Sequence, residues 1–180
     1  MATTNFRPLS IAILTVSDTR DKQTDNSGNY LVEAVATAGH NLFEKVIVKD
    51  DIHAIRSIVS AWIANSAVNA IITTGGTGFY LRDVTPEAIS PLFDKPIEGF
   101  GELFRAISYQ EIGTSTIQSR ALGGMANNTA LFCLPGSQNA CKTGWSKIIC
   151  EQLDSRIQTL QLCGASIGTG VIQPKSDYAY

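Results

Sequence analysis

Apolar residues follow two different periods along the chain. Nearly continuous apolar runs, of which residues 11–16 are the clearest, are typical of strands buried on both faces of a parallel sheet. Strand-like segments lie at residues 11–16, 42–48, 69–74 and 129–134. Apolar residues recur at helical spacing in residues 28–38, 52–63, 98–112 and 139–162. Because strands and helices alternate, the connections must cross over the faces of the sheet. The pattern therefore predicts an α/β fold with three layers, a mostly parallel, doubly wound sheet and helices on both faces.

Polar residues at the predicted helix starts indicate where these helices begin. Asn26 or Ser27 can cap the first helix, and Asp50 and Asp51 offer side-chain acceptors to the opening amides of the second. Thr85 can cap a short further helix, since a proline follows at the first helical position.

The length and charge of the chain narrow its range of functions. At 180 residues we expect one domain, residues 11–163, between an N-terminal arm, residues 1–10, and a C-terminal tail, residues 164–180. The formal net charge is -2, from 14 basic and 16 acidic residues without a basic run, which argues against a nucleic-acid or anionic-membrane partner. The start of the chain lacks the order of a secretory signal, and no apolar run approaches the roughly 20 residues that span a bilayer. We therefore expect a cytoplasmic protein.

The cysteines do not form a recognisable metal or redox motif. Cys133, Cys141, Cys150 and Cys163 never occur as C-x-x-C, and the histidines lie far from them in sequence. We expect reduced thiols in the core or at the surface.

Candidate chemistry gathers where the predicted strands end. In an open parallel sheet, ligands bind outside the carboxyl ends of the strands, because the loops converge there and the following helices point their N-termini at the ligand. The glycines in residues 73–78 can adopt positive φ and turn backbone amides toward an anion such as phosphate. The residues of this segment that we expect to contact the anion, called the glycine loop below, are Thr74, Gly75, Gly76, Thr77 and Gly78. A tight turn after a strand explains the glycines equally well.

Charged residues beside the glycine loop indicate a cation site. Arg82 and Asp83 follow within a few residues and supply an oxyanion donor and a cation ligand. With Asp50 or Asp51 from a neighbouring strand end, the carboxylates can converge on one Mg²⁺ ion that also binds substrate phosphates. For Asp51 alone a helix cap is the alternative, and the two roles do not exclude each other.

Two further strand ends contribute to the expected site. Ser17 and Asp18 can form a wall of hydrogen-bonding groups for a polar heterocycle, or take part in capping the first helix. Pro135, Gly136 and Ser137 form a second glycine loop aimed at a helix start, which suits another phosphate or the edge of a polar ligand. The alternative for this loop is again a turn.

Several of these motifs occur together in one order. They are Ser17-Asp18 with residues 25–28, then residues 73–78, 82–88 (Arg-Asp-Val-Thr-Pro-Glu-Ala), 119–121 (Ser-Arg-Ala) and 134–137. Together they resemble the MoaB/MogA family of molybdenum cofactor biosynthesis. The match in order and spacing extends over about residues 11–162, and residues 99–105 and 111–115 look closer to the MoaB branch.

The resemblance implies a molybdopterin-binding fold. In catalytically active members it also implies adenylylation of molybdopterin by Mg-ATP, which yields adenylylated molybdopterin and pyrophosphate. By position it assigns catalysis and Mg²⁺ binding to Asp50 and Asp83, with Asp51 as an alternative to Asp50. It assigns phosphate to the glycine loop, and it places three residues beside the pterin: Ser17, Asp18 and Ser137.

The resemblance also implies a homo-oligomer, either a trimer or a hexamer, and other cofactor-biosynthesis enzymes are further expected partners. We expect Phe100, Phe104 and Tyr109 to supply an apolar subunit interface. Two alternatives to the adenylyltransferase stay open. One is a non-catalytic molybdopterin carrier or scaffold, and the other is a nucleotide pyrophosphatase of related fold.

Overall fold

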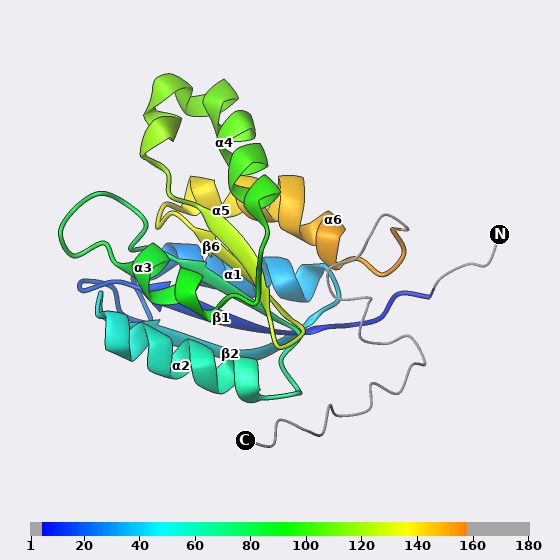
Figure 1. Ribbon diagram of the computed structural model, residues 1–180. Helices are drawn as coiled ribbons and strands as arrows, with labels where there is room; N and C mark the ends of the chain where they lie inside the picture. Colours follow the sequence, from blue (N-terminus) through cyan, green and yellow to red (C-terminus); the bar gives the residue numbers. More distant parts are fainter. Residues whose placement is uncertain (1–4, 158–180) are drawn as a thin grey trace, which may run out of the picture.

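A six-stranded sheet forms the centre of the molecule in the computed structural model, which describes residues 5–157 (Figure 1). The strands are β1 (Ser10–Val16), β2 (Asn41–Val48), β3 (Ala70–Thr74), β4 (Lys95–Pro96), β5 (Leu122–Ala126) and β6 (Thr129–Leu134). In the sheet order β2-β1-β3-β6-β5-β4, the first four strands run parallel and β5 is antiparallel to both of its neighbours. The predicted α/β fold with a mostly parallel sheet is confirmed.

Helices cover both faces of this sheet (Figure 1). One face carries α1 (Asn26–Thr37), α5 (Gln138–Gly144), the π-helical turn η3 (Trp145–Ile149) and α6 (Cys150–Leu153). The other face carries α2 (Ile52–Ala64) and α3 (Thr85–Ile89), which continues into the 3-10 turn η1 (Ser90–Leu92). The helix α4 (Glu98–Ile112) and the 3-10 turn η2 (Gly113–Gln118) form an arm that stands out from the sheet.

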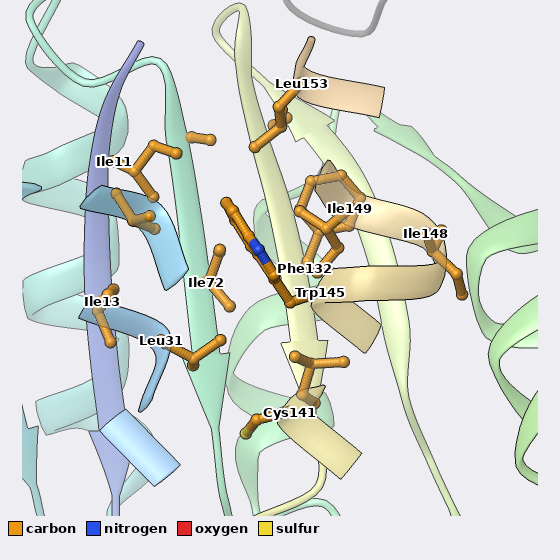
Figure 2. Packing of buried hydrophobic residues seen from close by; sticks show 14 of the residues in the cluster. Ile11, Ile13, Leu31, Ile72, Phe132, Cys141, Trp145, Ile148, Ile149 and Leu153 are labelled. Atoms are coloured by element: carbon orange, nitrogen blue, oxygen red, sulfur yellow. The ribbon is translucent and has the colours of Figure 1, made fainter. Parts of the chain in front are cut away.

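The side chains of β1 alternate between two apolar cores. Ile11 and Ile13 join Phe132 and Trp145 in the core beneath α1 and α5 (Figure 2). Leu14 belongs to the second core, beneath α2. Because successive strand residues point to opposite faces, a strand buried on both faces must be apolar at almost every position. This explains the continuous apolar run in the sequence.

The antiparallel part of the sheet was not predicted. The strand β4 has only two residues, one of them a proline, and β5 carries two adjacent glycines, so neither shows the apolar pattern of a strand. A two-residue turn joins β5 to β6, and its residues Asn127 and Asn128 have φ of 45° and 65°. Positive φ at both positions is what a type I′ hairpin turn requires.

Three predicted helix boundaries were wrong. The final helix does not reach residue 162: it ends at Leu153, and the predicted part beyond residue 157 lies outside the described residues. The Asp154 carboxylate accepts a hydrogen bond from the backbone N–H of Arg156 at 2.9 Å, which stabilises a turn in place of further helix. Thr85 does not cap α3 but lies within it, because its hydroxyl instead donates to Gly75 O at 2.9 Å.

The third wrong boundary concerns the start of α1. Asp25, rather than Asn26 or Ser27, is the N-cap, and its carboxylate accepts the N–H of Gly28 at 2.9 Å. Asp25 is only 1% exposed, and Lys45 Nζ on β2 lies 2.7 Å from its other carboxylate oxygen. A buried ion pair therefore fixes the first turn of α1 to the sheet.

Replacing Lys45 with methionine should destabilise the fold, because it leaves the Asp25 carboxylate buried without its counter-charge. We expect the free energy of unfolding at pH 7, measured by urea denaturation, to fall by about 3 kcal/mol. The double variant Asp25→Asn/Lys45→Met buries no charge and should lose less. Equal stability of Lys45→Met and the wild type would contradict this role of the pair.

The same pair predicts a pH dependence. Burial raises the pKa of Asp25, but the hydrogen bonds from Lys45, Gly28 and Thr15 together with the Lys45 charge outweigh burial, so this pKa lies below 3.8. A carboxyl group whose pKa is lower in the folded state stabilises the fold above its unfolded pKa, and that contribution is lost as the pH falls through the folded value. In Lys45→Met burial acts on Asp25 without the Lys45 charge, so its pKa is higher there than in the wild type. As the pH falls, Asp25 is protonated first in the variant, and the stability difference from the wild type should narrow until Asp25 is protonated in both.

Two of the three aromatic residues expected at a subunit interface belong to the core instead. Phe100 and Phe104 are 3% and 1% exposed, since their helical spacing places both on the face of α4 that packs on Phe132. Tyr109 is exposed. The homo-oligomer stays a prediction, but Phe100 and Phe104 are not available to it.

Among residues 5–157, no helix combines the length and apolar character needed to cross a bilayer.

Candidate functional site

A cleft of about 610 Å³ opens at the carboxyl ends of β1, β3 and β6. All but one of the residues predicted for the site line this cleft: Ser17, Asp18, Asp50, Thr74, Gly75, Gly76, Thr77, Gly78, Arg82, Asp83, Pro135, Gly136 and Ser137. They come from separate strand ends, as the topology of a parallel sheet predicts. Their chemical roles stay predictions.

Asp51 is the predicted site residue that does not line the cleft. Its carboxylate accepts the backbone N–H of Ala54 at 2.7 Å and caps α2, while its side chain is exposed. The neighbouring Asp50 lines the cleft instead. Of the two adjacent acids, the structure brings only Asp50 to the other predicted residues.

The glycine positions of the loop after β3 pack too closely against their surroundings to accept a side chain. Gly75 and Gly76 have φ of 101° and 62°, in the left-handed region that favours glycine. A Cβ atom at Gly76 would lie 2.7 Å from Asp50 Oδ1. Thr85 holds the loop from α3, because its N–H donates to Gly76 O at 2.9 Å. The glycines thus permit both the turn and the close approach of Asp50.

Three carboxylates share this part of the cleft. Asp18 Oδ1 accepts the backbone N–H of Asp50 at 3.3 Å, and Asp83 Oδ2 accepts the N–H of Tyr80 at 2.9 Å. Asp50 Oδ1 is buried and has no hydrogen-bond partner among the described residues. Burial, followed by the charges of Asp18 and Asp83, raises the pKa of Asp50, and Arg82 only partly opposes this. A cation bound here would relieve both the repulsion and the unsatisfied oxygen.

These acids do not form a complete protein-only metal cage. In the described part of the chain, no group of three or more His, Cys, Asp or Glu side chains is placed to hold a metal ion. Mg²⁺ is commonly bound through one or two carboxylates, water and substrate phosphates. Asp50 and Asp83 fit that mode.

Arg120 holds the outer part of the glycine loop, a role that sequence reasoning missed. Its Nε donates to Thr77 O at 3.2 Å, and its Nη2 donates to Gly78 O at 2.5 Å and to Asp83 O at 2.7 Å. Its Nη1 forms an ion pair with Glu87. The Ser-Arg-Ala motif at residues 119–121 was the available signal, but nothing local indicated that this arginine reaches the loop.

The floor of the cleft joins the ends of β3 and β6. Thr74 Oγ1 donates to Pro135 O at 3.0 Å and lies 3.1 Å from Cys141 Sγ. Ser27 Oγ donates to Gly136 O at 2.8 Å. Burial raises the pKa of Cys141 to about 11, so the thiol is neutral at physiological pH. The cysteine therefore contributes packing to this floor.

Both serines predicted to lie beside the pterin have local structural roles. Ser137 caps α5, since its Oγ accepts the N–H of Ala140 at 3.1 Å. Ser17 Oγ accepts the N–H groups of Thr19 and Arg20, each at 3.2 Å. Both serines line the cleft, so these turns also set its shape.

The end of the cleft under α4 and η2 was not anticipated. It is lined by residues of the arm and of α5 that include Ser108, Glu111, Ser115, Asn139 and Thr143. The helical period of residues 98–112 predicted α4 but not its position, because that depends on contacts with α5 far along the chain.

Known proteins share this architecture. A family model described as "Probable molybdopterin binding domain" matches residues 12–155. The chain is 54% identical over 153 residues to molybdenum cofactor biosynthesis protein B of Escherichia coli (strain K12), which covers 85% of this chain and 90% of that protein.

Solved structures of similar proteins have the same fold. A crystal structure of a molybdenum cofactor biosynthesis protein B is 44% identical and superposes with a TM-score of 0.79, covering 85% of this chain and 94% of the other. The tungsten cofactor synthesizing protein MoaB from Pyrococcus furiosus is 37% identical with a TM-score of 0.71, covering 81% and 92%. This chain therefore belongs to the MoaB/MogA family of molybdenum cofactor biosynthesis proteins.

Proposed function

We propose that the protein adenylylates molybdopterin with Mg-ATP and releases pyrophosphate. The observation that carries the proposal is Asp50, whose unpartnered, buried Oδ1 lies against the glycine loop in the same cleft as Asp83. A carboxylate in this state is costly to the fold unless a cation or a proton completes it. A binding protein that only shelters a pterin has no need of it.

The chemistry requires no protein nucleophile. The terminal phosphate of the pterin attacks the α-phosphorus of ATP, a new P–O bond forms, and the bond to the pyrophosphate leaving group breaks. Such a transfer depends on positioning and on charge neutralisation. Mg²⁺, held by Asp50 and Asp83, would supply positive charge to the phosphates.

The residues of the chain have distinct tasks in this scheme. The Gly75 N–H donates to Leu134 O at 3.0 Å, so the amides of Gly76, Thr77 and Gly78 are the ones that offer donors to phosphate oxygens, because the positive φ angles of Gly75 and Gly76 turn the loop. Arg82 lines the same cleft and is exposed, so its guanidinium can pair with a phosphate. Thr74 and Thr85 keep the loop fixed from below and from α3.

A turnover assay tests the proposal. Purified protein is incubated with molybdopterin, ATP and Mg²⁺, and the products are separated by chromatography. We expect adenylylated molybdopterin and pyrophosphate in equal amounts. Binding of molybdopterin without turnover would instead identify a carrier, and hydrolysis of a dinucleotide without any pterin would identify a pyrophosphatase.

A further inference from the structure

One further carboxylate, Glu111, lines the cleft from the arm formed by α4 and η2. Glu111 lies on α4 and is exposed. Its Oε2 accepts a hydrogen bond from Asn139 Nδ2 at 2.8 Å, and the Thr143 hydroxyl lies 3.3 Å from both carboxylate oxygens. Both donors belong to α5, so the carboxylate is held in one orientation at this wall.

These contacts leave Glu111 with unused acceptor capacity. An ionised carboxylate offers about four acceptor positions on its two oxygens. Asn139 and Thr143 supply one N–H and one O–H between them. The remaining positions are open to a ligand in the cleft, and the exposed apolar side chain of Ile112, the next residue of α4, also lines the cleft.

We propose that Glu111 accepts the two adjacent N–H donors of a 2-amino-4-oxopyrimidine edge, and that this end of the cleft thereby holds the pterin ring. The proposal rests on the proposed function and adds which end of the cleft takes which part of the reactants. The phosphates then lie at the glycine loop, and the ring lies between α4 and α5.

The hydrogen-bond pattern of a carboxylate selects among heterocycles. The pterin edge presents N3–H beside the 2-amino group, and two parallel N–H donors match a carboxylate in the same way as an arginine fork does. The pairing edge of adenine instead presents a donor beside a ring-nitrogen acceptor, whose lone pair would face a carboxylate oxygen. Glu111 therefore favours the pterin over the adenine of ATP at this position.

A matched pair of ligands tests the role of Glu111 by equilibrium binding to the full chain. The probes are 6-hydroxymethylpterin phosphate and its 2-oxo counterpart, 6-hydroxymethyllumazine phosphate, which differ only at position 2. The wild type should bind the pterin at least about tenfold more tightly, because a charged hydrogen bond is lost with the 2-amino group. In Glu111→Gln, the amide oxygen accepts from N3–H and the amide nitrogen donates to the 2-oxo group. This variant should therefore prefer the lumazine.

The control is Thr143→Val, which removes one donor to Glu111 and keeps the carboxylate. It should retain the preference for the pterin. If Glu111 only links α4 to α5, both variants lower the thermal midpoint and neither changes the pterin-to-lumazine ratio, which would overturn the proposal. Failure of the wild type to bind the pterin phosphate at millimolar concentration would also overturn it.

The experiments distinguish failure of the Glu111 proposal from failure of the adenylyltransferase proposal. An unchanged ratio in Glu111→Gln, together with turnover of molybdopterin, contradicts the role of Glu111 alone. A reversed ratio without turnover contradicts adenylyl transfer alone and leaves a pterin site at α4.

Discussion

Asp50→Asn should abolish adenylyl transfer, with kcat falling by roughly 10²- to 10³-fold or more, while molybdopterin binding is retained. The substitution keeps the size of the side chain and removes the charge that would bind Mg²⁺ beside the glycine loop. It also removes the repulsion among Asp18, Asp50 and Asp83, so the fold should be as stable as the wild type or more so. The measurements are initial rates at saturating Mg-ATP, pterin binding and the thermal midpoint.

The adjacent Asp51 supplies a matched control, since Asp51→Asn changes the same charge one residue away. Its carboxylate caps α2 and does not line the cleft. Asparagine is also a good N-cap, so this variant should keep both kcat and stability. Asp51→Ala should lose about 1 kcal/mol of stability and still turn over. Full activity of Asp50→Asn, or equal inactivity of Asp51→Asn, would contradict the assignment.

Arg120→Lys should raise the KM for ATP and lower kcat together, each by about tenfold or more, although lysine keeps the charge. The guanidinium donates to the carbonyls of Thr77, Gly78 and Asp83 at once, and a single ammonium group cannot reproduce that fork. The loop that carries Arg82 and Asp83 then loses its fixed position. Displacement of a catalytic group by about 1 Å can cost as much as 10²-fold in rate.

Arg120 acts through the loop, so its test must separate positioning from folding. Glu87→Gln breaks the ion pair with Arg120 but leaves the three carbonyl contacts. Because the Glu87 side chain is half exposed, this variant should be nearly neutral in both activity and stability. If the rate of Arg120→Lys falls only in proportion to its folded fraction, measured by circular dichroism, Arg120 has a purely structural role.

The sequence predicted the parallel half of the sheet well because burial on both faces leaves a strong pattern. Residues 11–16 and 129–134 must be apolar to pack between two helical layers, and the helices between the strands follow their own period. The short β4 and the glycine-rich β5 leave no such pattern. Their pairing is a long-range property that the local sequence does not specify.

The candidate site was also predictable only in part. Topology alone brings strand ends together, which is why the glycine loop, Asp50 and the Pro135 loop were found in advance. It does not decide between Asp50 and Asp51, because that choice depends on which carboxylate caps α2. Arg120 and Glu111 were assigned no role, since their contacts lie more than 20 residues away along the chain.

The hairpin turn at Asn127 and Asn128 determines the position of Arg120 from the far end of the sheet. The turn fixes the antiparallel register in which Leu122 pairs with Cys133. Arg120 lies just before this ladder and the Pro135 loop lies just after it. The register of the two strands therefore sets the distance between Arg120 and the Pro135 loop. A slip of one residue would shift the guanidinium by about 3.3 Å and reverse the faces of β5. The distance between Arg120 and the Pro135 loop therefore depends on two asparagines that do not line the cleft.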